Sequence, residues 1–262
     1  MRSVMSKLTV IFISLTIIGL MSASQSLAAI DLGNCVGAWL FETIVGNKVL
    51  DSSGTGNDGD IMGSPTLVPG RFGMAMDFGQ DNYIVIPNSA SMALEHITMA
   101  AWVYLRSYTE DARILTQEVD GSPYSTYSIM MSGAGYMKFE FRIALDNVRQ
   151  RIPSSVDIPL EAWTHVAATY DGEKAVIYIN GAVELEQPQS GTLLNNDNPL
   201  YIGASQYWTP RFVDGMLDEV ALFNVALDQD QIMELAEVGI SDVTAVSSQG
   251  KLVTTWAQIK NQ

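Results

Sequence analysis

The sequence predicts an all-β fold, a two-sheet antiparallel sandwich with one short C-terminal helix. Short apolar runs recur along the middle of the chain and turn residues separate them, which is typical of sandwiches. Residues 137–143 alternate apolar and charged side chains, as expected of a strand with one face on a core. Asn180-Gly181 separates two further runs, and this dipeptide favours a tight hairpin because both turn positions need positive φ.

The remaining strands are expected, in chain order, at residues 36–41, 74–78, 83–86, 97–104, 113–117, 127–131, 164–170, 174–179, 182–186, 200–202 and 212–223. In the alternating segment, four apolar side chains should face the core: Met137, Phe139, Phe141 and Ile143. The three charged side chains between them should face water: Lys138, Glu140 and Arg142.

The helix is expected to begin after Asp228, which would cap it in a reciprocal pair with Gln231. Gly239 would end the helix, because glycine readily adopts the left-handed conformation found there. Its buried stripe would consist of Ile232, Leu235 and Ala236.

Residues 1–28 have the features of a signal peptide. Arg2 and Lys7 accompany an apolar run at 8–20, and Ser26-Leu27-Ala28 fits a signal-peptidase site. The run is shorter than the roughly 20 residues that span a bilayer, although a retained anchor is the alternative. We therefore expect a secreted chain, extracellular or periplasmic, with no membrane insertion. It would comprise a domain at 30–238 and a tail of unknown role at 239–262.

The charge balance limits the class of partner. With 14 Lys and Arg against 29 Asp and Glu, the formal net charge is −15. Such a chain repels phosphate backbones and anionic lipids, which argues against nucleic acid and membrane surfaces as partners. Cys35 is the only cysteine, so no internal disulfide can form. A buried structural thiol is the expected role of Cys35; lipidation is the alternative.

Several short motifs follow one another in a specific order. They are Gly-Ala-Trp-Leu-Phe at 37–41, Asp-Ser-Ser-Gly-Thr-Gly-Asn-Asp-Gly at 51–59, Gly-Arg-Phe-Gly-Met-Ala-Met-Asp-Phe at 70–78, Trp-Thr-His-Val at 163–166 and Gly-Met-Leu-Asp-Glu-Val-Ala-Leu-Phe-Asn at 215–224. In this order they resemble laminin-G-like domains of the concanavalin A-like lectin/glucanase superfamily, over residues 34–238. The resemblance implies a jelly-roll sandwich. Its members differ in function, with sugar binding, protein adhesion and glycoside hydrolysis all represented.

The resemblance also implies one structural Ca²⁺. Asp51, Asn57 and Asp58 lie among three glycines, and calcium binds carboxylate, amide and backbone oxygens. In the resembling family, this loop and the acidic pair of the last core strand, here Asp218 and Glu219, often hold the ion. The alternative is a polar turn whose side chains cap its own backbone.

Aromatic side chains beside polar groups mark the candidate ligand site. Tyr207, Trp208 and Arg211 stand together in an expected loop, and Tyr124 belongs to a second such segment. Catalysis is not expected: Glu118 begins a sandwich-glucanase signature, but no second glutamate follows in range.

The predicted function is thus a secreted, lectin-like binding or adhesion module that recognises a glycan or an extracellular protein surface. The alternative is a structural or interaction protein without a small ligand. A divergent polysaccharide hydrolase or lyase is the weakest of the three hypotheses.

Overall fold

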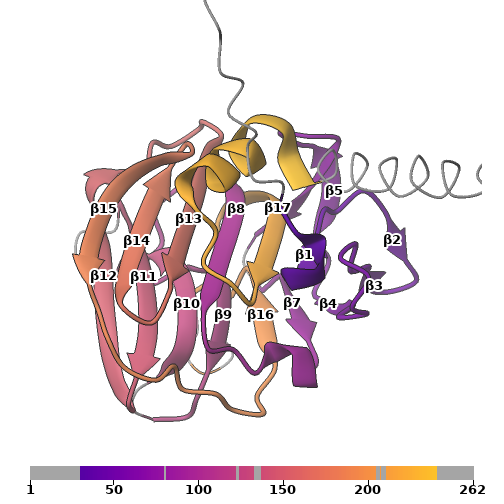
Figure 1. The fold of residues 1–262 in the computed structure, drawn as a ribbon. Coiled ribbons are helices and arrows are strands. Elements are labelled where there is room, and N and C mark those ends of the chain that lie inside the picture. Colours follow the sequence, from indigo (N-terminus) through magenta and orange to yellow (C-terminus); the bar gives the residue numbers. More distant parts are fainter. Residues whose placement is uncertain are drawn as a thin grey trace, which may run out of the picture.

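The computed structural model describes residues 30–79, 81–121, 124–132, 137–204, 207 and 211–240. Two antiparallel sheets lie face to face in a jelly-roll sandwich, which confirms the predicted fold class (Figure 1). The predicted signal peptide and tail residues 241–262 lie outside the described residues. None of the helices in the described ranges has the length and apolar character needed to cross a membrane.

One sheet has eight strands. They are β1 (Cys35–Trp39), β5 (Thr66–Pro69), β6 (Met74–Phe78), β8 (Ile97–Leu105), β13 (Thr164–Tyr170), β14 (Lys174–Ile179), β15 (Ala182–Pro188) and β17 (Gly215–Phe223). Their order across the sheet is β15-β14-β13-β8-β17-β6-β5, and β1 pairs with β17 beside this path. The β14–β15 hairpin turns at Asn180 and Gly181 with φ of 51° and 79°, as the sequence predicts.

The other sheet has nine strands. They are β2 (Ile44–Val45), β3 (Lys48–Val49), β4 (Gly59–Met62), β7 (Tyr83–Ile86), β9 (Arg113–Glu118), β10 (Ser125–Met131), β11 (Lys138–Leu145), β12 (Val148–Asp157) and β16 (Leu200–Ile202). Their order is β12-β11-β10-β9-β16-β7-β4-β3-β2. Strands β2 to β5 and β12 are absent from the sequence-based prediction.

The main core fills the space between the two sheets. Phe139, Phe141 and Ile143 of β11 are buried there, as predicted. Met137 is instead 36 % exposed, because β11 begins one residue later. Glu140 and Arg142 do not face water as expected: their side chains are buried, 0 % and 4 % exposed, on the face of the sheet opposite the core.

A second apolar layer covers the outer face of the eight-stranded sheet, where the C-terminal helix (residues 229–240) packs (Figure 1). The predicted cap is confirmed, because Asp228 and Gln231 each accept a hydrogen bond from the other's backbone amide. Gly239 has the positive φ, 76°, that favours glycine at a helix end. The predicted stripe is also buried: Ile232 and Leu235 belong to this layer, and Ala236 is buried beside them in the sequence.

Cys35 lies in the same layer, at the start of β1. Its side chain is 1 % exposed, and burial raises the pKa of its thiol to about 12, with the Asp51 charge adding to the rise. A thiol held neutral in this way is a poor nucleophile. The described environment therefore agrees with a packing role.

Candidate functional site

The outer face of the nine-stranded sheet carries a row of polar residues. Thr116 of β9, Ser128 of β10, Arg142 of β11 and Arg151 of β12 are register partners across four strands. Partners in an antiparallel sheet point to the same side. Since the neighbours of these residues along each strand enter the core, the row points away from it.

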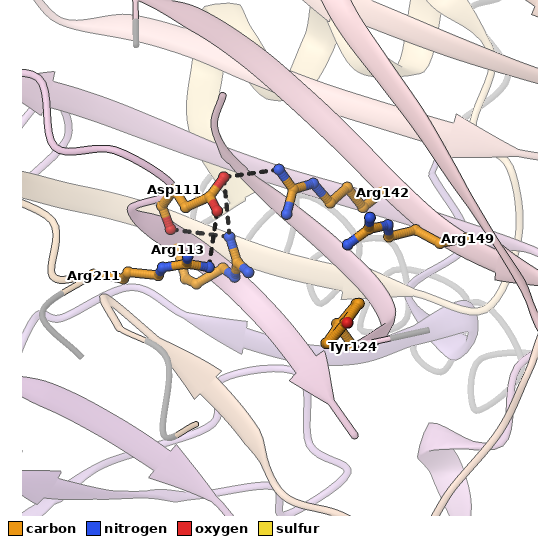
Figure 2. A pocket seen from close by; sticks show the side chains of 6 residues that line it. All are labelled: Asp111, Arg113, Tyr124, Arg142, Arg149 and Arg211. Carbon is orange, nitrogen blue, oxygen red and sulfur yellow. Dashed lines mark hydrogen bonds and ion pairs between the residues drawn. The ribbon is translucent and has the colours of Figure 1, made fainter. Parts of the chain in front are cut away.

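A pocket of about 140 Å³ opens on this face (Figure 2). Residues far apart in the sequence line it, because β9 to β12 form one end of the sheet. Its lining is Asp111 and Arg113 at the start of β9, Tyr124 before β10, Arg142 of β11, Arg149 of β12, and Arg211 before β17. The dominant chemical character is that of arginine.

Asp111 organises the arginines around one carboxylate (Figure 2). Its Oδ1 lies 2.7 Å from Nη2 of Arg142, and its Oδ2 lies 2.8 Å from Nη1 of Arg211. Arg113 Nη1 donates to the Asp111 backbone carbonyl at 2.9 Å and lies 4.0 Å from Oδ1. These contacts fix three guanidinium groups at the pocket, so these side chains are ordered without a ligand.

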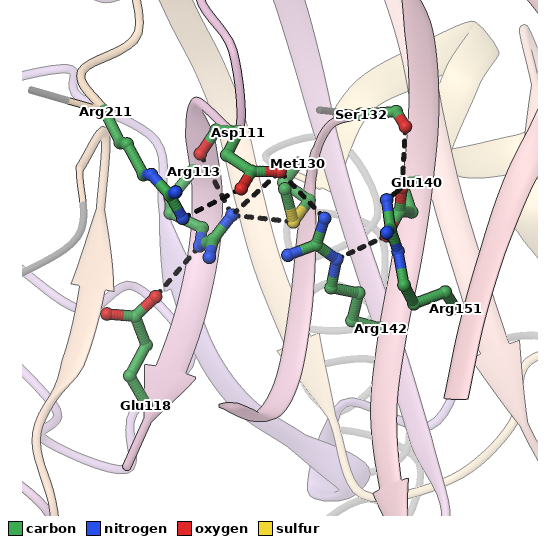
Figure 3. Close-up of polar contacts among 9 residues, drawn as sticks. All are labelled: Asp111, Arg113, Glu118, Met130, Ser132, Glu140, Arg142, Arg151 and Arg211. Carbon is green, nitrogen blue, oxygen red and sulfur yellow. Dashed lines mark hydrogen bonds and ion pairs between the residues drawn. The ribbon is translucent and has the colours of Figure 1, made fainter. Parts of the chain in front are cut away.

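Two further carboxylates extend the network beneath the pocket (Figure 3). Glu118 Oε1 lies 2.8 Å from Nε of Arg113. Glu140 accepts from Arg142 Nε, from Arg151 at 2.7 and 2.9 Å, and from the Ser132 hydroxyl at 2.7 Å. Every arginine that pairs with Glu118 or Glu140 is therefore partly neutralised.

The pKa values follow from this arrangement. Burial alone would raise the pKa of Glu140, but hydrogen bonds from Arg151 and Arg142 outweigh it and lower the pKa to about 2. Burial lowers the pKa of Arg113; Glu118 offsets part of this effect, while the Arg142 charge adds to it. Arginine stays protonated in proteins all the same.

Positive charge is in excess at the site. Four arginines (Arg113, Arg142, Arg151 and Arg211) share three described carboxylates (Asp111, Glu118 and Glu140), and Arg149 is a fifth arginine at the site. Arg149 has no ion pair with any described carboxylate, and its guanidinium lies 4.9 Å from the centre of the Tyr124 ring. In a chain of net charge −15, this pocket is a local exception.

Tyr124 is held in an unusual backbone conformation, with φ of 73°. A non-glycine residue in the left-handed region costs on the order of 1 kcal/mol, and such residues concentrate at functional sites. The geometry presents the Tyr124 ring, with Arg149 stacked on it, at the pocket wall (Figure 2).

The structure places the predicted ligand residues in different surroundings. Tyr124 and Arg211 line the same pocket. Tyr207 is half-buried and is not part of the lining, and Trp208 lies outside the described residues. Three arginines that line this pocket are absent from the sequence-based prediction of the ligand site: Arg113, Arg142 and Arg149. One signal was present in the sequence: Arg142, Arg149 and Arg151 stand close together in a chain with only 14 basic residues.

The predicted calcium loop is organised by hydrogen bonds to its own carboxylates. Asp51 accepts hydrogen bonds from the amides of Ala38, Ser53 and Asn57 and from the Ser53 hydroxyl, all at 2.8–2.9 Å. The Thr55 hydroxyl lies 2.8 Å from Asp51 Oδ2 and 2.6 Å from the Val36 carbonyl, and can donate to one of them at a time. A carboxylate has about four lone-pair sites. Asp58 accepts from the Asp51 amide at 2.9 Å. In this arrangement the Asp51 carboxylate caps the backbone of its own loop, as in the alternative of a polar turn.

Asp218 and Glu219 lie on the outer face of the other sheet. Asp218 Oδ2 accepts from the amides of Arg71 and Phe72, at 2.8 and 3.0 Å, while its buried Oδ1 has no partner among the described residues. Burial raises the pKa of Asp218 to about 7, and the nearby Glu42 charge adds to the rise. Glu219 accepts a hydrogen bond from the Ile240 amide.

Within the described ranges, no three His, Cys, Asp or Glu side chains are grouped to hold a metal ion. An ion beside Asp218 would therefore need oxygens from backbone carbonyls as well. The unpartnered Oδ1 of Asp218 is compatible with such an ion.

Comparisons with solved structures find the same fold. Domain 4 of AbnA, a GH43 extracellular arabinanase from Geobacillus stearothermophilus, solved with arabinotriose, has a TM-score of 0.64 and 19 % identity over 78 % of this chain and 98 % of that domain. The binding domain of Paraclostridial Mosquitocidal Protein 1 has a TM-score of 0.61 and 14 % identity, over 78 % of this chain and 52 % of that one.

Trypanosoma rangeli sialidase, solved with sialic acid, has a TM-score of 0.59 and 18 % identity, over 80 % of this chain and 33 % of the enzyme. At these identities the likeness concerns the fold alone. A search of curated proteins found no significant match.

A laminin-G family model, described as the concanavalin A-like lectin/glucanases superfamily, matches residues 78–233. This range is more than half of the chain, and it includes the strands that line the pocket, β9 to β12. The chain therefore belongs to the concanavalin A-like lectin/glucanase superfamily.

Proposed function

We propose that this chain is a recognition module that binds a glycan in the arginine-lined pocket of the nine-stranded sheet. The observation that carries the proposal is the pocket itself, where ordered polar groups and the Tyr124 ring converge on about 140 Å³ of space. Sugars bind proteins through an aromatic face and a few fixed hydrogen-bonding groups. A fold relative solved with arabinotriose supports the choice of a glycan over other small ligands.

Binding is favoured over catalysis by the state of the buried carboxylates. A glycosidase needs one carboxyl that holds a proton near neutral pH, so its pKa must be raised. The pKa of Glu140 is lowered to about 2, and Glu118 is paired with Arg113 at 2.8 Å. His165 belongs to the other sheet, and burial lowers its pKa to about 3. Asp218, whose pKa is raised to about 7, also belongs to the other sheet and does not line the pocket. A hydrolase or lyase acting at this pocket is therefore the weaker candidate.

A panel of oligosaccharides, including arabinotriose, tests the proposal by titration calorimetry. We expect at least one saccharide to bind, and Tyr124→Ala to weaken its binding about tenfold or more. A matched control is Tyr108→Ala, because Tyr108 is not among the pocket-lining residues and hydrogen-bonds to the Ile158 carbonyl. The release of reducing ends from the same panel would identify an enzyme and contradict the proposal.

An interaction protein without a small ligand is the alternative, and it predicts a different result. No saccharide in the panel would bind, while a protein partner would bind whether or not Tyr124 is replaced. Measuring saccharide and protein binding to both Tyr124→Ala and Tyr108→Ala separates the two hypotheses.

We also propose a single structural Ca²⁺ at Asp218 rather than at Asp51. The buried, unpartnered Oδ1 of Asp218 and the nearby Glu42 charge support this position. A cation there would neutralise two carboxylates and stabilise the folded state. After treatment with a chelator, Ca²⁺ should raise the melting temperature of the wild type and leave that of Asp218→Asn unchanged. An equal rise in both would contradict the assignment.

We propose that the chain is exported and that its leader is removed after Ala28, on the residue pattern of positions 1–28. N-terminal sequencing of protein recovered from the periplasm or medium should begin at Ala29. A retained leader in that protein would favour a membrane anchor.

A further inference from the structure

We propose that the pocket recognises an acidic glycan, with the anionic group of the sugar bound between Arg142, Arg149 and Arg211. This inference rests on the proposed function, because it names the chemical class of the ligand in the same site. The shared ligand chemistry is a carboxylate or a sulfate ester on a saccharide.

The excess of positive charge at the pocket is the first argument for an anionic ligand. Asp111 lies 2.7 Å from Arg142 and 2.8 Å from Arg211, so these two guanidinium groups share one carboxylate. Arg149 lines the same pocket without a described carboxylate partner. A neutral sugar would leave this positive excess unbalanced, whereas one anionic group would neutralise it at short range.

The geometry of the guanidinium groups is the second argument for an anionic ligand. A guanidinium group offers parallel N–H donors that match carboxylate and sulfate oxygens, and lysine lacks this geometry. Among the described residues that line the pocket, every cation is an arginine, and stacking on Tyr124 orients Arg149. Three guanidinium groups fixed by existing contacts form a prepared anion site.

The Tyr124 ring at the pocket wall favours a saccharide over a bare anion or an acidic peptide. Sugars bind proteins through an aromatic face and a few fixed hydrogen-bonding groups, and the pocket offers both. An anionic sugar would therefore contact the ring with its apolar face and the guanidinium groups with its charged group.

The test is a calorimetric titration of the whole chain with five probes. They are trigalacturonate, its fully methyl-esterified form, a sulfated galactan trisaccharide, arabinotriose and hexaglutamate. We expect an acidic trisaccharide to bind at least about tenfold more tightly than the methyl ester and arabinotriose. This preference should fall as salt is raised. The first and third probes separate the carboxylate from the sulfate ester.

Arg149→Gln is the decisive variant, because no described carboxylate is left unpaired when its charge is removed. It should lose the preference for the acidic probe and keep the wild-type melting temperature. Arg149→Lys keeps the positive charge but lacks the planar guanidinium group with its parallel N–H donors. It should bind the acidic probe with intermediate affinity. Lys174→Gln is the matched control: it removes one positive charge from the other sheet and should leave binding unchanged.

The possible outcomes distinguish the two levels of the proposal. If arabinotriose or the methyl ester binds as tightly as the acidic probes, the anionic class is wrong and glycan binding stands. If hexaglutamate binds and no saccharide does, the proposals of glycan binding and of an acidic glycan are both wrong, and the pocket binds an acidic peptide. If Lys174→Gln weakens binding as much as Arg149→Gln, the effect is one of net charge and the pocket assignment is wrong.

Discussion

Replacing Glu140 by glutamine tests the buried network beneath the pocket. The Glu140 side chain is 0 % exposed, and Arg142, Arg151 and Ser132 all donate to it. These contacts lower the pKa from 4.5 to about 2. Because a pKa lowered in the folded state stabilises that state above the unfolded pKa, the stabilisation is present at neutral pH and is lost as the pH falls through about 4.5 towards 2.

The magnitude follows from the same pKa values. Each pKa unit corresponds to about 1.4 kcal/mol, so the fall from 4.5 to about 2 contributes roughly 3 kcal/mol at pH 7. At pH 3 the unfolded carboxyl is already protonated, and only about 1 kcal/mol remains. Glu140→Gln should therefore lower the free energy of unfolding by roughly 3 kcal/mol at pH 7 and by roughly 1 kcal/mol at pH 3.

Urea denaturation at both pH values measures this difference. Glu186→Gln is the control, because Glu186 pairs with Lys174 at 2.9 Å on the surface, where a single ion pair contributes little. A loss for Glu140→Gln that is equal at pH 7 and pH 3 would refute the electrostatic reasoning. A loss near zero at both would show that the network does not stabilise the fold.

Three further predictions concern the opposite side of the molecule. Asp51→Ala should lower the free energy of unfolding by about 2 kcal/mol or more even with a chelator present, because three amides and the Ser53 hydroxyl lose their acceptor. An effect seen only with calcium would favour Asp51 as a calcium ligand. The pKa of Asp218 is raised to about 7, so without metal the folded state loses stability as the pH rises from about 4 to 7. For the wild type this loss in the free energy of unfolding should be roughly 4 kcal/mol. Urea denaturation of Asp218→Asn should show no such loss between pH 4 and 7, and a loss that persists in this variant would come from another group. Cys35 should react with a thiol reagent only after unfolding, and fast labelling of the native chain would contradict its burial.

The strands that the sequence predicted share one property: a clear apolar pattern next to a turn. Strand β11 shows alternation, and the β14–β15 hairpin has Asn180-Gly181. The missed strands lack such a signal. Strands β2 and β3 have two residues each, and β12 contains Pro153, which argues against a strand. Proline is tolerated there because β12 is an edge strand.

Only part of the candidate site could be predicted from the sequence. Alternation correctly predicts that Glu140 and Arg142 point away from the core, but it does not say what covers that face. Their burial depends on ion pairs with Asp111 and Arg151, which come from other strands and loops. Tyr124 stood out because aromatic residues beside polar ones are a local pattern. Arg149 lies at the pocket because of the register in which β12 pairs with β11, which the sequence alone does not indicate.

A crystal structure with bound trigalacturonate would show directly whether the arginine-lined pocket binds an acidic sugar. We predict that a sugar carboxylate lies within hydrogen-bond distance of Arg149 and of Arg142 or Arg211, with the sugar next to the Tyr124 ring. A sugar bound elsewhere, for example in the cavity of about 320 Å³ between β14 and the start of the C-terminal helix, would contradict it.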